Sequence, residues 1–145
     1  MWKRRRREDG HGGPTIPLHG GEWQWAHLRD EVQRCLGRPW RRQEWWPRDA
    51  VVNRVSGSMR EYLGQRYDPE RAELIRGGWD HDHCEICTHK IWDRGEEEDR
   101  FGYTTDGREW VCTECYRKFL APDAEYGELI AAWQSQQRHE DAGSH

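Results

Sequence analysis

Two cysteine pairs constrain the fold of this chain more than any other feature of its sequence. Cys84 and Cys87 form one Cys-x-x-Cys motif, Cys112 and Cys115 form another, and 24 residues separate the two pairs. Each motif bends the backbone so that both sulfurs reach one ion, and two motifs fill the four positions of a tetrahedral structural zinc site. We therefore predict that these thiolates hold one structural Zn²⁺, with ligand softness favouring zinc over iron. Such a site leaves no coordination position open for catalysis.

The apolar composition explains why a chain of 145 residues would need a metal site. Leu, Ile, Val and Phe account for only 19 residues and 34% of the residues are charged, which approaches the composition of disordered chains. Ten Trp and five Tyr offset this shortage, because each large ring can bury roughly 150–250 Å². We expect a small, aromatic, metal-dependent core.

Cysteine usage and the lack of long apolar runs indicate the compartment. No segment resembles a signal peptide, and no apolar run approaches the ~20 residues of a membrane span. We therefore expect a cytoplasmic protein with no membrane partner. In a reducing cytosol, paired Cys-x-x-Cys motifs bind metal more often than they form disulfides, and the odd fifth cysteine, Cys35, fits a reduced chain. Cys35 itself is expected to be a small buried hydrophobe.

Charge is distributed unevenly along the chain. Residues 1–78 carry 16 Arg and Lys against 11 Asp and Glu, residues 79–122 carry 6 against 11, and residues 123–145 carry 1 against 5. The cysteine region is therefore acidic, and four thiolates around one Zn²⁺ would add two further negative charges. Such a module would repel phosphate, which argues against a DNA-binding finger.

In the first half of the chain, the sequence predicts a tail and then a helical region rich in Trp and Arg. Residues 1–21 combine a short basic run with Gly, His and Pro and show no hydrophobic period, which is typical of a flexible tail. Residues 22–78 contain two apolar stripes at helical spacing, and we predict a helix for each. The first stripe is Trp25, Leu28, Val32 and Leu36, and the second follows Pro47 and comprises Val51, Val55, Met59, Tyr62 and Leu63. A strand is favoured over residues 71–78.

Residues 79–122 contain all four paired cysteines. Residues 103–105 and 109–112 can pair as a hairpin across Asp106-Gly107, a dipeptide that suits a type I′ turn. The period then changes, and a short helix is predicted that ends before Pro122. Its apolar positions are Cys115, Tyr116, Phe119 and Leu120.

The C-terminal part predicts one further helix. Asp123 is a suitable N-cap for residues 123–137, and residues 138–145 are expected to form a polar tail. Four apolar side chains share one face of this helix and would cover the Trp-rich core: Tyr126, Leu129, Ile130 and Trp133.

The order of knuckle, loop, hairpin and helix over residues 79–122 resembles the treble-clef group of zinc fingers. In that group a zinc knuckle supplies the first ligand pair and the first turn of a helix supplies the second, which implies the same four cysteines as ligands. The chain is also similar to uncharacterised small bacterial proteins that carry an Asp-His-Asp-His-Cys-x-x-Cys segment followed by Trp-Val-Cys-x-x-Cys. That similarity implies no settled activity.

The Asp-His-Asp-His string at residues 80–83 also occurs in HNH-type nucleases, where a histidine activates water and an acidic residue or a histidine binds Mg²⁺. In the related recombination endonucleases the string lies between the two cysteine pairs, whereas here it precedes the first pair and only His89 lies between them. We therefore keep nuclease activity as a weaker alternative. The simpler expectation is that His81 and His83 form hydrogen bonds that orient the metal ligands.

The sequence as a whole predicts an α+β protein, with a small zinc-stabilised treble-clef module at residues 79–122 flanked by amphipathic helices. We expect a non-enzymatic protein-interaction module that acts as an adaptor, an inhibitor or an immunity-type protein. We predict no catalytic residues, no small-molecule substrate and no cofactor other than zinc. The alternative is a nucleic-acid-binding zinc finger that uses the basic N-terminal half, where Arg and Trp side chains could stack on bases.

Overall fold

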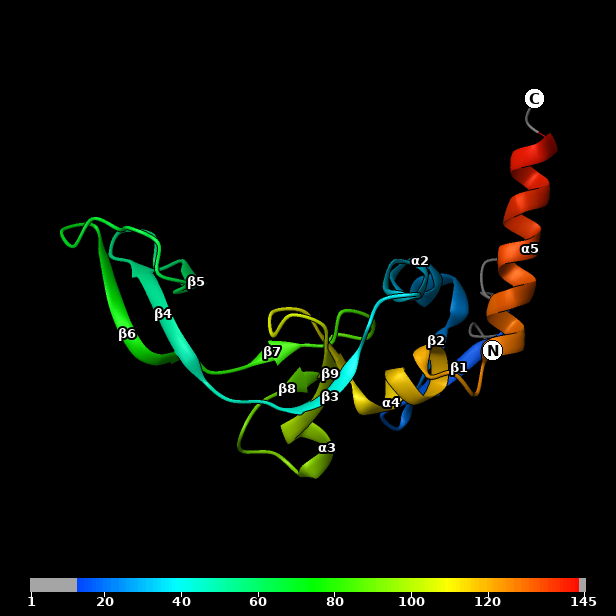
Figure 1. Ribbon diagram of the computed structural model, residues 1–145, viewed down its shortest axis with the longest axis horizontal. Coiled ribbons are helices and arrows are strands. Elements are labelled where there is room, and N and C mark those ends of the chain that lie inside the picture. The colour runs from blue at the N-terminus through cyan, green and yellow to red at the C-terminus, as the bar shows by residue number, and fades with distance from the viewer. Residues whose placement is uncertain (1–12, 144–145) are drawn as a thin grey trace, which may run out of the picture. The chain divides into compact units, whose positions relative to one another are not determined.

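The computed structural model describes residues 13–143, which form short strands and helices (Figure 1). The prediction of an α+β protein is confirmed. The strands are β1 (Thr15–Leu18), β2 (Gly21–Gln24), β3 (Arg41–Glu44), β4 (Arg48–Asn53), β5 (Met59–Glu61), β6 (Ala72–Trp79), β7 (Asp82–His83), β8 (Lys90–Ile91), β9 (Phe101–Thr104) and β10 (Trp110–Cys112). The helical segments are α2 (Trp25–Cys35), α3 (Glu97–Arg100), α4 (Thr113–Cys115), the π-helical turn η1 (Tyr116–Leu120) and α5 (Gly127–Gly143).

These elements group into two compact units. The first unit contains the described chain up to Pro39, the segment Glu85–Cys87, and the chain from Thr113 onward. The second unit contains Trp40–Cys84 and Thr88–Cys112. Each unit buries aromatic side chains of its own, Trp25 and Phe119 in the first and Trp45 and Trp110 in the second.

The first unit opens with a hairpin that the sequence pattern did not predict. Strands β1 and β2 pair antiparallel across a two-residue turn, His19-Gly20. Both turn residues have positive φ, +50° and +80°, which is the type I′ geometry that matches the twist of paired strands. Ile16 and Leu18 are fully buried on one face of β1. The predicted flexible tail is therefore wrong from Thr15 onward, and its first twelve residues lie outside the described part of the chain.

Helix α2 follows from the predicted apolar stripe. Trp25, Leu28 and Val32 are buried along one face, and Cys35 is buried beside them. The ring of Trp25 packs 5.9 Å from that of Phe119 in η1, measured between centroids. The first predicted helix is confirmed over these residues, although the residues just before it pair as β2.

The predicted short helix after the second cysteine pair is confirmed as α4 followed by η1. Phe119 is buried there, and the helix ends at Leu120, before Pro122. The C-terminal helix begins later than predicted, at Gly127, because Tyr126 donates its N–H back to the carbonyl of Lys118 (2.9 Å) and the connecting residues form turns. It also continues through most of the predicted polar tail, to Gly143.

The second unit contains a three-stranded antiparallel sheet in the order β10-β9-β3. Trp110 and Val111 are fully buried on β10. Gly102, in the central strand β9, packs closely against both residues. A Cβ atom at this position would lie 3.1 Å from the Val111 carbonyl oxygen and 3.2 Å from the Trp110 ring. Only glycine allows this close packing without displacement of its neighbours.

The predicted hairpin between β9 and β10 is confirmed, but its turn is longer than the two residues expected. Thr104 pairs with Trp110, so five residues connect the strands. Asp106 Oδ1 accepts hydrogen bonds from the backbone N–H groups of Arg108 (2.9 Å) and Glu109 (3.1 Å), and these bonds lower the pKa of the Asp106 carboxyl. The side chain thus satisfies backbone donors within a wider loop.

The second predicted helix is wrong, because residues 48–61 form strands β4 and β5 of a separate sheet in the order β5-β4-β6. Asn53 breaks the helical pattern: its Oδ1 accepts hydrogen bonds from the N–H groups of Val55 and Ser56, both at 2.8 Å. Gly57 then adopts φ +75° and closes the turn. The helical region predicted over residues 22–78 is therefore helical only as α2, whereas the strand predicted over residues 71–78 is confirmed as β6.

Between residues 13 and 143, none of the helices combines the length and the apolar character that crossing a membrane requires.

Candidate metal centre

The first cysteine pair lies on a tight backbone knuckle that follows β7. The N–H of Cys84 donates to the carbonyl of His89 (2.8 Å), and the N–H of Thr88 donates back to the carbonyl of Cys84 (2.9 Å). Thr88 has φ +66°, a left-handed conformation that is uncommon for a β-branched residue and marks a sharp reversal of the chain. These contacts bring Cys84 and Cys87 back toward one another.

The second pair spans the transition from strand to helix. Cys112 is the last residue of β10, and Cys115 is the last residue of α4, which continues into η1. Three residues of helix rotate the chain by almost one full turn. The two side chains therefore return to the same side of the chain.

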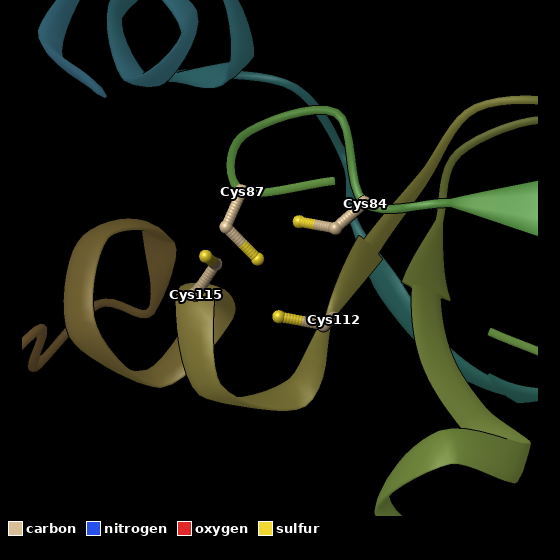
Figure 2. Close-up of side chains that lie close together, drawn as sticks. All are labelled: Cys84, Cys87, Cys112 and Cys115. Atoms are coloured by element: carbon tan, nitrogen blue, oxygen red, sulfur yellow. The ribbon is translucent and has the colours of Figure 1, made fainter. Parts of the chain in front are cut away.

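The structure brings the two pairs together. The four sulfur atoms lie within 4.8 Å of one another, and Figure 2 shows the side chains converging from the knuckle, from β10 and from the helix. All four cysteine side chains are buried, at most 3% exposed. Tetrahedral Zn–S bonds of ~2.3 Å place neighbouring sulfurs about 3.8 Å apart, so the cluster needs little adjustment to hold a metal ion. The ligand set predicted from the sequence is brought together at one point.

Each pair also carries an acidic residue whose carboxylate is hydrogen-bonded within the first unit. Glu85, inside the first motif, accepts a hydrogen bond from the guanidinium of Arg34 in α2 (2.9 Å), which also bonds Glu31. Glu31 and Glu85 together raise the pKa of Arg34. The knuckle is thereby joined to α2.

Glu114, inside the second motif, faces a buried lysine. Lys118 Nζ donates to Glu114 (2.9 Å) and to the backbone carbonyl of Pro17 in β1, and the N–H of His19 also donates to Glu114. Burial opposes ionisation of Glu114, but Lys118 and the N–H of His19 lower the pKa of its carboxyl. This cluster attaches the helix after the second pair to the β1–β2 hairpin, and sequence spacing gave no signal for it beyond the i, i+4 separation of Glu114 and Lys118.

The Asp-His-Asp-His segment has a structural role that the sequence did not indicate. The carboxylate of Asp82 accepts hydrogen bonds from the indole of Trp45 (2.9 Å), the indole of Trp79 (3.2 Å) and the guanidinium of Arg48 (2.7 Å). Burial opposes the charge of Arg48, but its bonds to Glu61 and to Asp82 raise its pKa. Because three N–H donors already bind the carboxylate of Asp82, this side chain joins Trp45, Trp79 and Arg48 and is not favoured as a metal ligand.

The two histidines of this segment lie against each other. The rings of His81 and His83 meet edge to face with centroids 4.8 Å apart, and His81 Nδ1 is hydrogen-bonded to Asp80 (2.7 Å). This bond lowers the pKa of the Asp80 carboxyl. The expected role of the histidines in orienting the cysteine ligands stays a prediction.

No protein family, no curated protein and no solved structure matches this chain. Its chemistry is therefore inferred from its own residues, and the buried cluster of four thiols could hold a metal ion.

Proposed function

We propose that the chain is a non-enzymatic protein in which Cys84, Cys87, Cys112 and Cys115 hold one structural Zn²⁺, and that the fold so stabilised presents a binding surface to another protein. The observation that supports metal binding is the convergence of four buried cysteine sulfurs within 4.8 Å of one another. A set of four thiolates suits tetrahedral zinc and leaves no position for a substrate. The order of knuckle, hairpin and helix supports a treble-clef arrangement.

The zinc would contribute a large share of the folding free energy. Structural zinc in small domains provides apparent binding free energies of about 10–16 kcal/mol at neutral pH, against total stabilities of about 5–15 kcal/mol for typical domains. Such a site would make the fold dependent on metal, since only 19 of the 145 residues are Leu, Ile, Val or Phe.

The sheet β5-β4-β6 supports the protein-binding part of the proposal. Of the large apolar side chains that the described residues expose, four lie on this sheet or in its connections: Val55, Met59, Leu63 and Ile75. Met59 pairs with Val52, and Ala50 pairs with Ile75. Since directly paired residues and residues two apart share a face of a sheet, the apolar side chains of three strands form one row. Met59 and Ile75 are the exposed members of this row, whereas Ala50 is fully buried, and exposed apolar residues grouped on one face are typical of interaction sites.

Native mass spectrometry tests the proposed zinc binding. The protein purified without added metal should show one Zn²⁺ per chain. Removal of zinc with a chelator should abolish the near-ultraviolet circular dichroism of the buried tryptophans. A metal-free protein with an unchanged spectrum and an unchanged melting temperature would contradict the structural role of zinc.

The binding surface is tested by isolating the tagged chain from its own cells as wild type, as the double variant Met59→Glu/Ile75→Glu, and as Arg60→Ser. Arg60 is the matched control, because it follows Met59 on β5 and points to the opposite face of the sheet. A protein retained by wild type and by Arg60→Ser, but lost from the double variant, supports the proposal. An apolar interface should also survive moderate salt, whereas retained nucleic acid that is released steeply by salt would indicate phosphate binding instead.

A further inference from the structure

A pocket of about 630 Å³ lies in the first unit, between helices α2 and α5, and none of the paired cysteines lines it. Pockets that bind small molecules commonly enclose about 300–1,000 Å³. Its walls combine apolar side chains with two basic ones. Those that matter to its chemistry are Trp25, His27, Arg29, Leu129, Ala132 and Trp133.

The two tryptophans bring an unusual feature to this pocket. Their rings meet edge to face, with centroids 6.1 Å apart and an angle of 90°, and Trp25 is only 3% exposed. The Nε1 atoms of Trp25 and Trp133 are both buried and have no hydrogen-bond partner within the described part of the chain. Buried N–H donors are nearly always satisfied, because leaving one without an acceptor costs free energy. Two unsatisfied donors at one pocket point to an acceptor that arrives from outside the fold.

The charge at the pocket specifies the kind of acceptor. The guanidinium carbon of Arg29 lies 5.7 Å from the centre of the Trp133 ring, and among residues 13–143 no carboxylate is paired with Arg29. His27 adds a second group that can carry positive charge. A guanidinium and N–H donors together favour a carboxylate, whereas Leu129 and Ala132 offer apolar surface beside them.

We infer that this pocket binds a small organic carboxylate that carries an aromatic or aliphatic group. The carboxylate pairs with Arg29 and accepts hydrogen bonds from the indoles of Trp25 and Trp133, and the apolar group packs against the α5 side of the pocket. Each indole N–H is covered in the free chain, so binding includes a small side-chain rotation that uncovers it, a change that is common at binding sites. This site is separate from the cysteine cluster and does not depend on the proposed protein partner.

The test uses the full-length, zinc-loaded protein labelled with ¹⁵N, because each indole N–H gives its own resonance. Trp25→Phe and Trp133→Phe keep an aromatic ring, remove one N–H each, and identify the two signals. Phenylacetate and hexanoate serve as probes, and phenylacetamide is the neutral control of the same shape. A capped peptide with one Glu between two Leu residues tests whether the carboxylate belongs to a protein instead.

We expect both acids to shift the two indole resonances downfield in a saturable manner, and phenylacetamide to bind at least about tenfold more weakly. Arg29→Gln should weaken binding of the acids by a similar factor, whereas Arg138→Gln, a change at an exposed residue of α5, should leave binding unchanged. Equal shifts with acid and amide, or no shift with any acid, would overturn the inference. Binding of the Glu peptide without binding of the free acids would overturn the assignment to a small molecule.

Discussion

Replacing Asp82 with Ala tests whether this carboxylate organises the second unit. Asp82 and Arg48 are each close to nine-tenths buried, with side chains 11% and 12% exposed, and their nearest nitrogen and oxygen atoms lie 2.7 Å apart. The same carboxylate accepts the indole N–H groups of Trp45 and Trp79. The substitution therefore leaves two indole donors and one buried positive charge without this acceptor.

The expected cost follows from these contacts. Removing one partner of a buried ion pair costs about 3–5 kcal/mol, and each hydrogen bond to a charged acceptor contributes about 1.5–3 kcal/mol. These values do not add, because the donors share one acceptor, and Arg48 keeps a second carboxylate, Glu61, at 2.7 Å. We therefore expect Asp82→Ala to lower the free energy of unfolding by about 3–5 kcal/mol. Asp82→Asn should cost less, because it keeps one acceptor oxygen.

Urea unfolding of the zinc-loaded variants, followed by tryptophan fluorescence, measures this cost, provided that the slope with denaturant is unchanged. Asp80→Ala is the matched control: it removes an acidic residue two positions away whose side chain is 58% exposed, and it should change stability by no more than about 0.5 kcal/mol. Zinc content must be equal in both variants, since Asp82 lies close to Cys84 in sequence. Equal costs for Asp82→Ala and Asp80→Ala would refute the role assigned to Asp82.

Three further outcomes are expected. Cys112→Ser should lose zinc and near-ultraviolet circular dichroism, whereas Cys35→Ala should keep one zinc per chain by mass spectrometry; equal zinc content would contradict the ligand assignment. Lys118→Met should lower the free energy of unfolding in urea by about 2–3 kcal/mol, because Glu114 stays largely buried without its positive partner, and a cost below that of an exposed Lys→Met change would refute this. Asp106→Ala should cost about 1 kcal/mol in the same assay by removing the acceptor of two loop N–H groups, and Asp106→Asn, which keeps the acceptor, should cost clearly less.

The parts of the fold that the sequence predicted correctly are those governed by local periodicity or by ligand spacing. The stripe of Trp25, Leu28 and Val32 is long enough to define α2, and the change of period after Val111 marks the helix that carries Cys115. The clustering of all four cysteines needs no further information, because thiol pairs at this spacing have few other uses in a reduced chain.

The parts that were predicted wrongly depend on side chains that override periodicity. Val51, Val55 and Met59 recur at helical spacing, but Asn53 captures two backbone N–H groups and reverses the chain between them. In β1 only two apolar residues, Ile16 and Leu18, mark the strand, too few to establish a period of two. The hydrogen bonds to Asp82 join residues 34 and 37 positions apart, a separation that no local pattern reports.

These contacts also change how the acidic character of residues 79–122 should be understood. In the sequence, this segment carries an excess of Asp and Glu that suggests a negative surface. In the structure, Glu85 is paired with Arg34 and Asp82 with Arg48, both from outside the segment, and Glu114 is paired with the buried Lys118. Much of the negative charge beside the cysteines is thus neutralised within each unit and serves to attach strands, helices and the knuckle to their neighbours. The case for a structural metal therefore depends on the closed, buried thiol cluster and not on the sign of the local charge.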